Sequence, residues 1–137
     1  MKIRLGNPLL VSARLEGQYG IVREVASLID FNAPYCVILR QDAIDLGYPH
    51  AANRHPDEER TRPDRVPVFT SWQGIQRGIV VRLNKVTVGP VVASEVDAVV
   101  LELQHPRFHT FDFVLGRTFL ANCKLTVDVK KGYVNMR

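Results

Sequence analysis

The chain has 137 residues, of which 46% are hydrophobic and 23% are charged, and this balance predicts one globular domain over residues 1–137. No apolar stretch approaches the roughly 18 residues that a membrane-spanning helix needs, and the N-terminus lacks a signal-peptide pattern, so we expect a cytoplasmic protein without a membrane partner. The net charge is +4, but the arginines are scattered rather than gathered in a stripe, which argues against a nucleic-acid partner.

The first third of the chain predicts strands joined by tight turns. Residues 8–15 and 21–29 have a strand-like pattern in which apolar residues partly alternate, and Gly17-Gln18-Tyr19-Gly20 between them has the composition of a hairpin turn. Residues 35–39 form a short apolar run typical of a buried strand, and residues 41–46 predict one or two turns of helix.

The composition changes over residues 50–65, which are charged and polar with almost nothing to bury. We expect this segment to be an exposed loop within the domain. A linker between two domains is the alternative. We disfavour it because the first 50 or so residues alone would form a small, poorly buried sheet.

The second half again predicts strands. Residues 66–72 and 75–83 flank Gln73-Gly74, which indicates a hairpin. The later elements that we expect are strands at 86–92 (broken or bulged at Gly89-Pro90), 96–103, 111–115, 125–129 and 133–136, and a short helix at 117–122.

Asp30 is the candidate catalytic residue. The run Ser27-Leu28-Ile29 ends on this carboxylate, and the chain then continues Phe31-Asn32-Ala33-Pro34 into a second apolar run. This pattern predicts a strand, a tight turn with a carboxylate at its mouth, and another strand. Taken alone, it also fits an ordinary turn in which an aspartate accepts a local backbone hydrogen bond.

A second motif, Phe111-Asp112-Phe113-Val114-Leu115-Gly116-Arg117-Thr118-Phe119-Leu120, lies near the end of the chain. An apolar strand that ends in glycine and leads into a short helix, paired with an earlier strand that ends in aspartate, resembles the single-lobed aspartic proteases of the retropepsin family. The resemblance covers residues 21–133. It implies an all-β, retropepsin-like closed barrel with one or two short helices.

The resemblance also implies a function. Such an enzyme is a homodimer in which Asp30 of each chain forms a dyad that activates water and hydrolyses an extended peptide, without cofactor or metal. The residues that it assigns are Phe31, Asn32 and Ala33 to the active-site loop, Trp72, Gln73 and Gly74 to a substrate-covering flap, and Gly116 and Arg117 to structural support. Residues 1–5 and 133–137 are then candidate interface strands.

The motif around Asp30 departs from the family pattern, which has Thr-Gly where this chain has Phe31-Asn32. Phenylalanine lacks the hydroxyl that links the two active-site loops in the dimer. The alternative is therefore a catalytically degenerate module of the same fold that binds extended peptides or a partner protein. An unrelated small β-barrel that binds nucleic acid through its arginines is a third possibility.

The remaining reactive side chains favour structural roles. Cys36 and Cys123 lie in apolar runs and read as reduced thiols, with a disulfide as the alternative. His105 and His109 have the spacing of two metal ligands on a helix, but Pro106 between them favours a loop. No metal site is therefore predicted.

Overall fold

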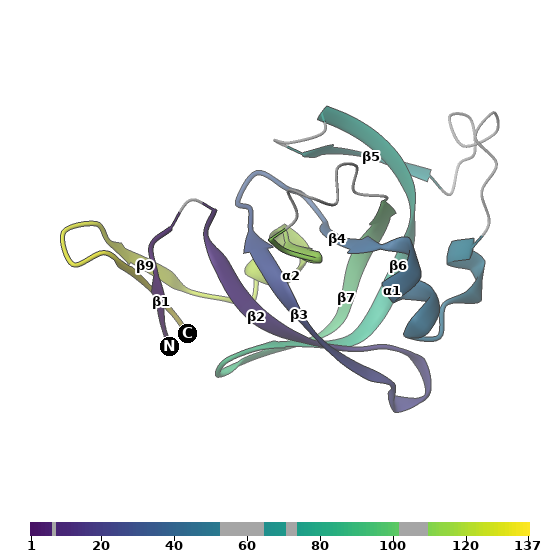
Figure 1. The fold of residues 1–137 in the computed structure, drawn as a ribbon, viewed down its shortest axis with the longest axis horizontal. Coiled ribbons are helices and arrows are strands. Elements are labelled where there is room, and N and C mark those ends of the chain that lie inside the picture. Colours follow the sequence, from purple (N-terminus) through teal and green to yellow (C-terminus); the bar gives the residue numbers. More distant parts are fainter. Residues whose placement is uncertain (7, 53–64, 71–73, 102–109) are drawn as a thin grey trace.

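Strands with one apolar face close into a barrel (Figure 1). The computed structural model describes residues 1–6, 8–52, 65–70, 74–101 and 110–137. In spatial order the barrel strands are β2 (Leu10–Glu16), β3 (Val22–Ile29), β8 (Phe113–Leu115), β4 (Cys36–Leu39), β7 (Val91–Leu101) and β6 (Gly74–Val88). Pairing of β2 with β6 closes this six-stranded barrel, and β5 (Arg65–Thr70) adds to the far part of β6. The all-β prediction is confirmed.

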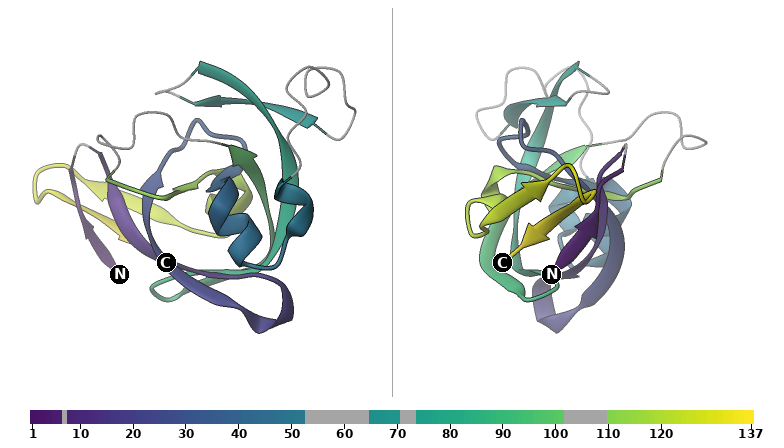
Figure 2. Two further views of the ribbon diagram at one scale, coloured as in Figure 1. Left: turned by 45° about the vertical axis from the view of Figure 1, so that its right-hand side comes forward. Right: turned by 90° about the vertical axis from the view of Figure 1, so that its left-hand side faces the viewer.

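A second, three-stranded antiparallel sheet lies beside the barrel (Figure 2). Its strands are β1 (Lys2–Arg4), β10 (Tyr133–Met136) and β9 (Leu125–Asp128), in that order. The first and last strands of the chain thus pair with each other inside one molecule. We call this element the terminal sheet.

The helical elements are short. They are α1 (Arg40–Asp45), α2 (Arg117–Leu120) and the 3-10 turns η1 (Gln18–Gly20) and η2 (Pro49–Ala52). Both predicted α-helices are present, each within a residue or two of the expected bounds. Of the segment expected as an exposed charged loop, residues 53–64 lie outside the described residues.

The prediction for residues 75–103 is wrong in its division into three strands. The described residues form two long strands, and Gly89-Pro90 is the turn between them, with Val88 opposite Val91 and Gly89 at φ +55°. Between the strands expected at 86–92 and 96–103, β7 is continuous but distorted. Glu95 has φ +54°, and residues 94–95 of β7 and 84–85 of β6 are successive exposed residues at this point.

Strand β8 explains the apolar run near the end of the sequence. Phe113 and Leu115 point into the barrel core, while Val114 belongs to a smaller cluster on the opposite face with Val37 and Val99. All three residues of β8 are essentially fully buried. A strand covered on both faces reads as a continuous hydrophobic run rather than an alternating one.

Helix α1 is tied to the barrel by a buried carboxylate. Arg23 Nε on β3 lies 3.2 Å from Asp42 Oδ1, and its Nη1 donates to Asp45 Oδ2 at 2.9 Å. Asp42 is only 5% exposed, whereas the Asp45 side chain is 42% exposed. Burial raises the pKa of Asp42, and the charge of Arg23 offsets part of that rise.

Replacing Asp42 by asparagine should leave the protein at least as stable as the wild type at pH 7. The folded-state pKa is raised, so the Asp42 contribution is most favourable below about pH 4 and declines as the pH rises through the folded-state value. Urea unfolding at several pH values measures this, and the stability difference should grow between pH 4 and pH 7. Asp45→Asn is the control, because an exposed ion pair contributes about 0.5 kcal/mol or less. Loss of stability in Asp42→Asn that is larger at pH 7 than at pH 4 would contradict the assignment.

Candidate active site

Asp30 lies at the end of β3, where that strand runs parallel to β8. Ser27 pairs with Phe113 and Ile29 with Leu115, and the Asp30 N–H donates to the Leu115 carbonyl at 3.1 Å. The turn after Asp30 and the turn at Gly116 therefore leave the same end of two neighbouring parallel strands. This arrangement brings together the two motifs that the sequence singled out.

The two oxygens of the Asp30 carboxylate have different surroundings. Oδ1 accepts the Asn32 N–H at 2.9 Å, while Oδ2 is buried and has no hydrogen-bond partner among the described residues. Asp30 as a whole is 9% exposed. Burying a carboxylate oxygen without a hydrogen-bond partner lowers the stability of the fold. An aspartate at this position therefore indicates a functional rather than a stabilising role.

Backbone hydrogen bonds hold the loop after Asp30, and one of them comes from the turn at Gly116. The Ala33 N–H donates to the Asp30 carbonyl at 3.3 Å, and the Arg117 N–H donates to the Ala33 carbonyl at 2.8 Å. A Cβ at Gly116 would lie 2.1 Å from the Tyr35 carbonyl oxygen and 2.8 Å from that of Ala33. Only glycine allows the two backbones to approach this closely. The structure thus brings together Asp30, Ala33, Gly116 and the Arg117 backbone.

Phe31 and Asn32 point away from this support. Ala33 is fully buried, whereas Phe31 is 51% exposed and Asn32 is exposed. Asn32 contributes its backbone N–H to the carboxylate. The large apolar side chain of Phe31 stays half in solvent beside the candidate catalytic group. The Arg117 side chain is exposed as well.

Thr118 is a supporting residue that the sequence reasoning missed. Its Oγ1 accepts the Cys36 N–H at 3.0 Å and donates to the Asp97 carbonyl at 2.6 Å. The hydroxyl therefore joins the start of α2 to β4 and β7, directly beneath the two turns. Its position two residues after Gly116 was the available signal, since a threonine at the start of a helix often bonds to nearby backbone.

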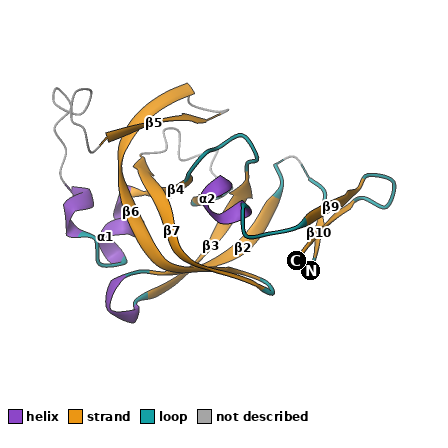
Figure 3. Cartoon of the chain, turned by 180° about the vertical axis from the view of Figure 1, so that it is seen from behind, coloured by secondary structure: helices purple, strands orange, loops and turns teal. Residues whose placement is uncertain are grey.

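A hairpin overhangs the same end of the barrel. Among the described residues, strand β6 pairs with β7 from Val80 onward, and its first residues pair with β5, from Ile79 opposite Arg65 to Gly74 opposite Thr70. Figure 3 shows this hairpin extending past the barrel at the end where β3 turns toward β4. Gly74 begins β6, while Trp72 and Gln73, the other predicted flap residues, lie outside the described residues.

Gly78 marks the place where β6 leaves the barrel. A Cβ at this position would lie 2.2 Å from the Val100 carbonyl oxygen of β7. The backbone of β6 can therefore pass this close to β7 only because residue 78 lacks a side chain.

Comparison with known proteins identifies the architecture. No protein-family model matches the sequence, and no curated protein matches it. A solved structure described as a retropepsin-like aspartic protease from Rickettsia conorii superposes with a TM-score of 0.62, covering 98% of this chain and 86% of that chain at 14% identity. The chain has a retropepsin-like fold. The expected fold class is confirmed, and at this identity the similarity concerns the fold alone.

A second similar structure is a protein of unknown function (DUF785) from Legionella pneumophila. It covers 82% of this chain and 83% of its own at 17% identity, with a TM-score of 0.44, which is too low to support an argument. The retropepsin-like barrel thus rests on the rickettsial structure and on the strand order itself.

The other reactive groups that the sequence singled out are two cysteines and two histidines. Cys36 and Cys123 are free thiols, so the disulfide alternative is wrong, and burial raises the pKa of both. His105 and His109 lie outside the described residues. Within the described ranges, no group of three or more His, Cys, Asp or Glu residues could hold a metal ion, and no helix is long and apolar enough to cross a membrane.

Proposed function

We propose that the protein is an aspartic-type endopeptidase of the retropepsin-like class that acts as a homodimer. The observation that carries this proposal is the Asp30 carboxylate at the end of β3, with one oxygen held by the Asn32 N–H and the other buried without a partner in the described structure. The Asn32 N–H fixes the orientation of the carboxylate, and the proposed reaction requires the second oxygen, which is buried in the single chain, to share a proton or a water in the dimer.

The chemistry requires a second carboxylate. One carboxylate takes a proton from water as the water oxygen bonds to the peptide carbonyl carbon, and its protonated partner donates to the carbonyl oxygen. Collapse of the tetrahedral diol breaks the C–N bond, and a proton passes to the leaving nitrogen. The second turn of this chain carries Gly116 where the first carries Asp30, so the partner carboxylate comes from Asp30 of a second copy.

Two further features support a dimer with an extended substrate. The half-exposed Phe31 lies next to Asp30, where a twofold partner would cover it. The β5–β6 hairpin overhangs the same end and offers strand edges for a peptide in extended conformation. Phe31 packing would replace the hydroxyl contact that retropepsins make between their two active-site loops.

Phe31 also favours a second candidate function. A half-exposed aromatic side chain without a hydroxyl, followed by Asn32, fits a degenerate module that binds an extended peptide without cleaving it. The two candidates share the fold and the ligand class and differ only in the hydrolytic step.

The test is cleavage of an unfolded protein substrate between pH 4 and pH 7, over a range of enzyme concentrations. We expect activity per chain to rise with concentration as dimers form, with sedimentation velocity reporting the dimer. Phe31→Thr should weaken the dimer, whereas Val92→Thr, which removes another exposed apolar side chain (57% exposed) on the barrel, should not.

The double variant Phe31→Thr/Asn32→Gly separates the two candidates. Cleavage by the wild type supports the peptidase. Cleavage by the double variant alone, with peptide binding by the wild type, supports the degenerate module. Absence of cleavage in both proteins at every pH would overturn the peptidase proposal.

A further inference from the structure

The net positive charge of the protein is concentrated on the terminal sheet. Residues 1–5 and 123–137 contain six lysines and arginines and one aspartate, a formal charge of +5. The rest of the chain has twelve basic and thirteen acidic residues, a formal charge of −1. Cations that are far apart in the sequence therefore cluster in the fold, because residues 1–5 and 123–137 form one sheet.

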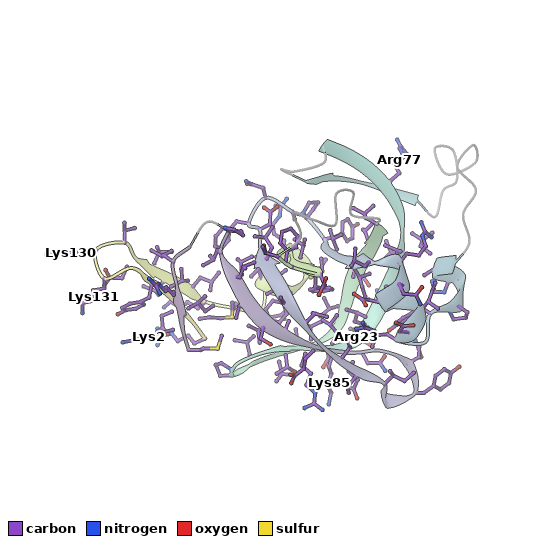
Figure 4. All side chains as sticks on the ribbon, viewed as in Figure 1. Lys2, Arg23, Arg77, Lys85, Lys130 and Lys131 are labelled. Atoms are coloured by element: carbon purple, nitrogen blue, oxygen red, sulfur yellow. The ribbon has the colours of Figure 1, made fainter. Side chains whose placement is uncertain are left out.

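The six cations line one projecting element. They are Lys2 and Arg4 on β1, Lys124 and Arg137 at the end of the sheet where their backbones pair, and Lys130 and Lys131 at the tip of the β9–β10 hairpin. All six are exposed, and Figure 4 shows Lys2, Lys130 and Lys131 on this projecting side of the molecule. None of the six forms an ion pair with another described residue.

The single aspartate of the sheet is used within the hairpin turn. Asp128 Oδ1 accepts the Lys131 N–H at 2.9 Å, and the Asp128 carbonyl accepts the Gly132 N–H at 2.9 Å. Gly132 adopts φ +78°, which closes the turn. The carboxylate thus fixes the shape of the tip and leaves the lysine side chains directed at solvent.

The tip is apolar as well as basic. Val129 is 77% exposed and directly precedes Lys130 and Lys131, and Val127 on the same hairpin is 51% exposed. Two interactions hold a peripheral protein on an anionic bilayer, one hydrophobic and one electrostatic. An aliphatic side chain next to lysines at the end of a projecting hairpin can make both. The aliphatic group enters the boundary of the acyl chains, and the ammonium groups contact lipid phosphates and carboxylates.

We infer that the terminal sheet docks on an anionic phospholipid membrane surface through the Val129-Lys130-Lys131 tip. A peripheral contact of this kind needs no spanning segment, so it differs from the membrane partner that the sequence argued against. The tip belongs to the turn between β9 and β10 and lies outside residues 1–5 and 133–137, the candidate interface strands of a dimer. A second copy at the tip itself is disfavoured, because a twofold contact there would bring lysines against lysines.

Nucleic acid explains fewer features of the terminal sheet than an anionic membrane does. Tyr133 is the single aromatic residue of residues 1–5 and 123–137, and the Lys2 ammonium lies 4.7 Å from its ring centroid. Its face is therefore already engaged by a cation. The exposed valines of the hairpin have no role in phosphate or base contacts.

The test is co-sedimentation of the full chain with vesicles of phosphatidylcholine, with and without phosphatidylserine, at about 0.1 M salt, where exposed charges act over about 10 Å. We expect binding to the anionic vesicles only. The double variant Lys130→Glu/Lys131→Glu should lower the apparent affinity at least about tenfold. Val129→Ser should lower it about fivefold, because it removes the apolar contact and keeps the charge.

A matched charge reversal on the barrel is the control. Arg14→Glu/Lys85→Glu changes the net charge equally at two exposed barrel positions and should change vesicle affinity less than about threefold. Thermal melts establish that each variant is folded. Absence of vesicle binding, or equal losses in the two double variants, would overturn the inference. Binding of single-stranded RNA without vesicle binding, unaffected by Val129→Ser, would assign the sheet to nucleic acid instead.

Discussion

Replacing Asp30 by asparagine should reduce peptide hydrolysis at least about a thousandfold while leaving the fold intact. The amide can neither take a proton from water nor share one with its partner, so both halves of the acid–base step fail in the dimer. Stability should change little, because the asparagine oxygen can still accept the Asn32 N–H and the side chain has the same shape. Initial cleavage rates and a urea melt on the same preparations measure the two effects.

The combination of outcomes distinguishes a catalytic from a structural aspartate. Asp112→Asn is the control, because Asp112 is an exposed aspartate just before β8 and the change in side chain is the same. It should retain wild-type cleavage. If Asp30→Asn still cleaved the substrate, or lost activity only in proportion to a loss of folded protein, Asp30 would be a turn residue and not the catalytic group.

Gly116→Ala should destabilise the protein by about 3 kcal/mol or more, which is a large share of the stability of a small domain. The new Cβ would lie 2.1 Å from the Tyr35 carbonyl oxygen, 2.5 Å from the Tyr35 carbonyl carbon and 2.8 Å from the Ala33 carbonyl oxygen. These atoms belong to the backbone and cannot move aside as a flexible side chain would. Relief of the overlap requires the Asp30 turn and the Gly116 turn to separate.

Gly20→Ala provides the comparison for this variant. Nothing lies within 4 Å of a Cβ at Gly20, but its φ of +73° disfavours a side chain. Its cost should therefore be limited to about 1 kcal/mol. Chemical denaturation of both variants separates overlap from backbone strain, and a loss for Gly116→Ala no larger than that for Gly20→Ala would contradict the tight crossing of the two turns.

The sequence predicted much of the fold because the signals were local. Partly alternating apolar residues predicted β2 and β3, and the apolar run at 111–115 predicted β8, which the structure shows to be buried on both faces. The aspartate and glycine turns were also recognisable, since each ends an apolar run. The prediction that these turns belong to one retropepsin-like barrel is confirmed at the level of the fold.

The parts that could not be predicted depend on pairing between distant residues. The sequence placed a break at Gly89-Pro90 inside a strand, but only the pairing of Val88 with Val91 shows that this is a hairpin turn. Likewise, the half-exposure of Phe31 and the burial of Asp30 Oδ2 without a partner among the described residues depend on how distant strands pack around the turn. A clustering of charge that joins residues 1–5 to 123–137 is invisible along the chain.

The pairing of β1 with β10 also has a consequence for how the chain folds. The Met1 amino group donates to the Met136 carbonyl at 2.9 Å, across a sequence separation of 135 residues, and Lys2 pairs with Asn135. Closing a loop of this length carries a large entropic cost, whereas the β9–β10 hairpin closes locally, so we expect the β1–β10 pairing to form late and to open early. On these grounds the barrel strands, which pair over shorter separations, form before β1 joins β10.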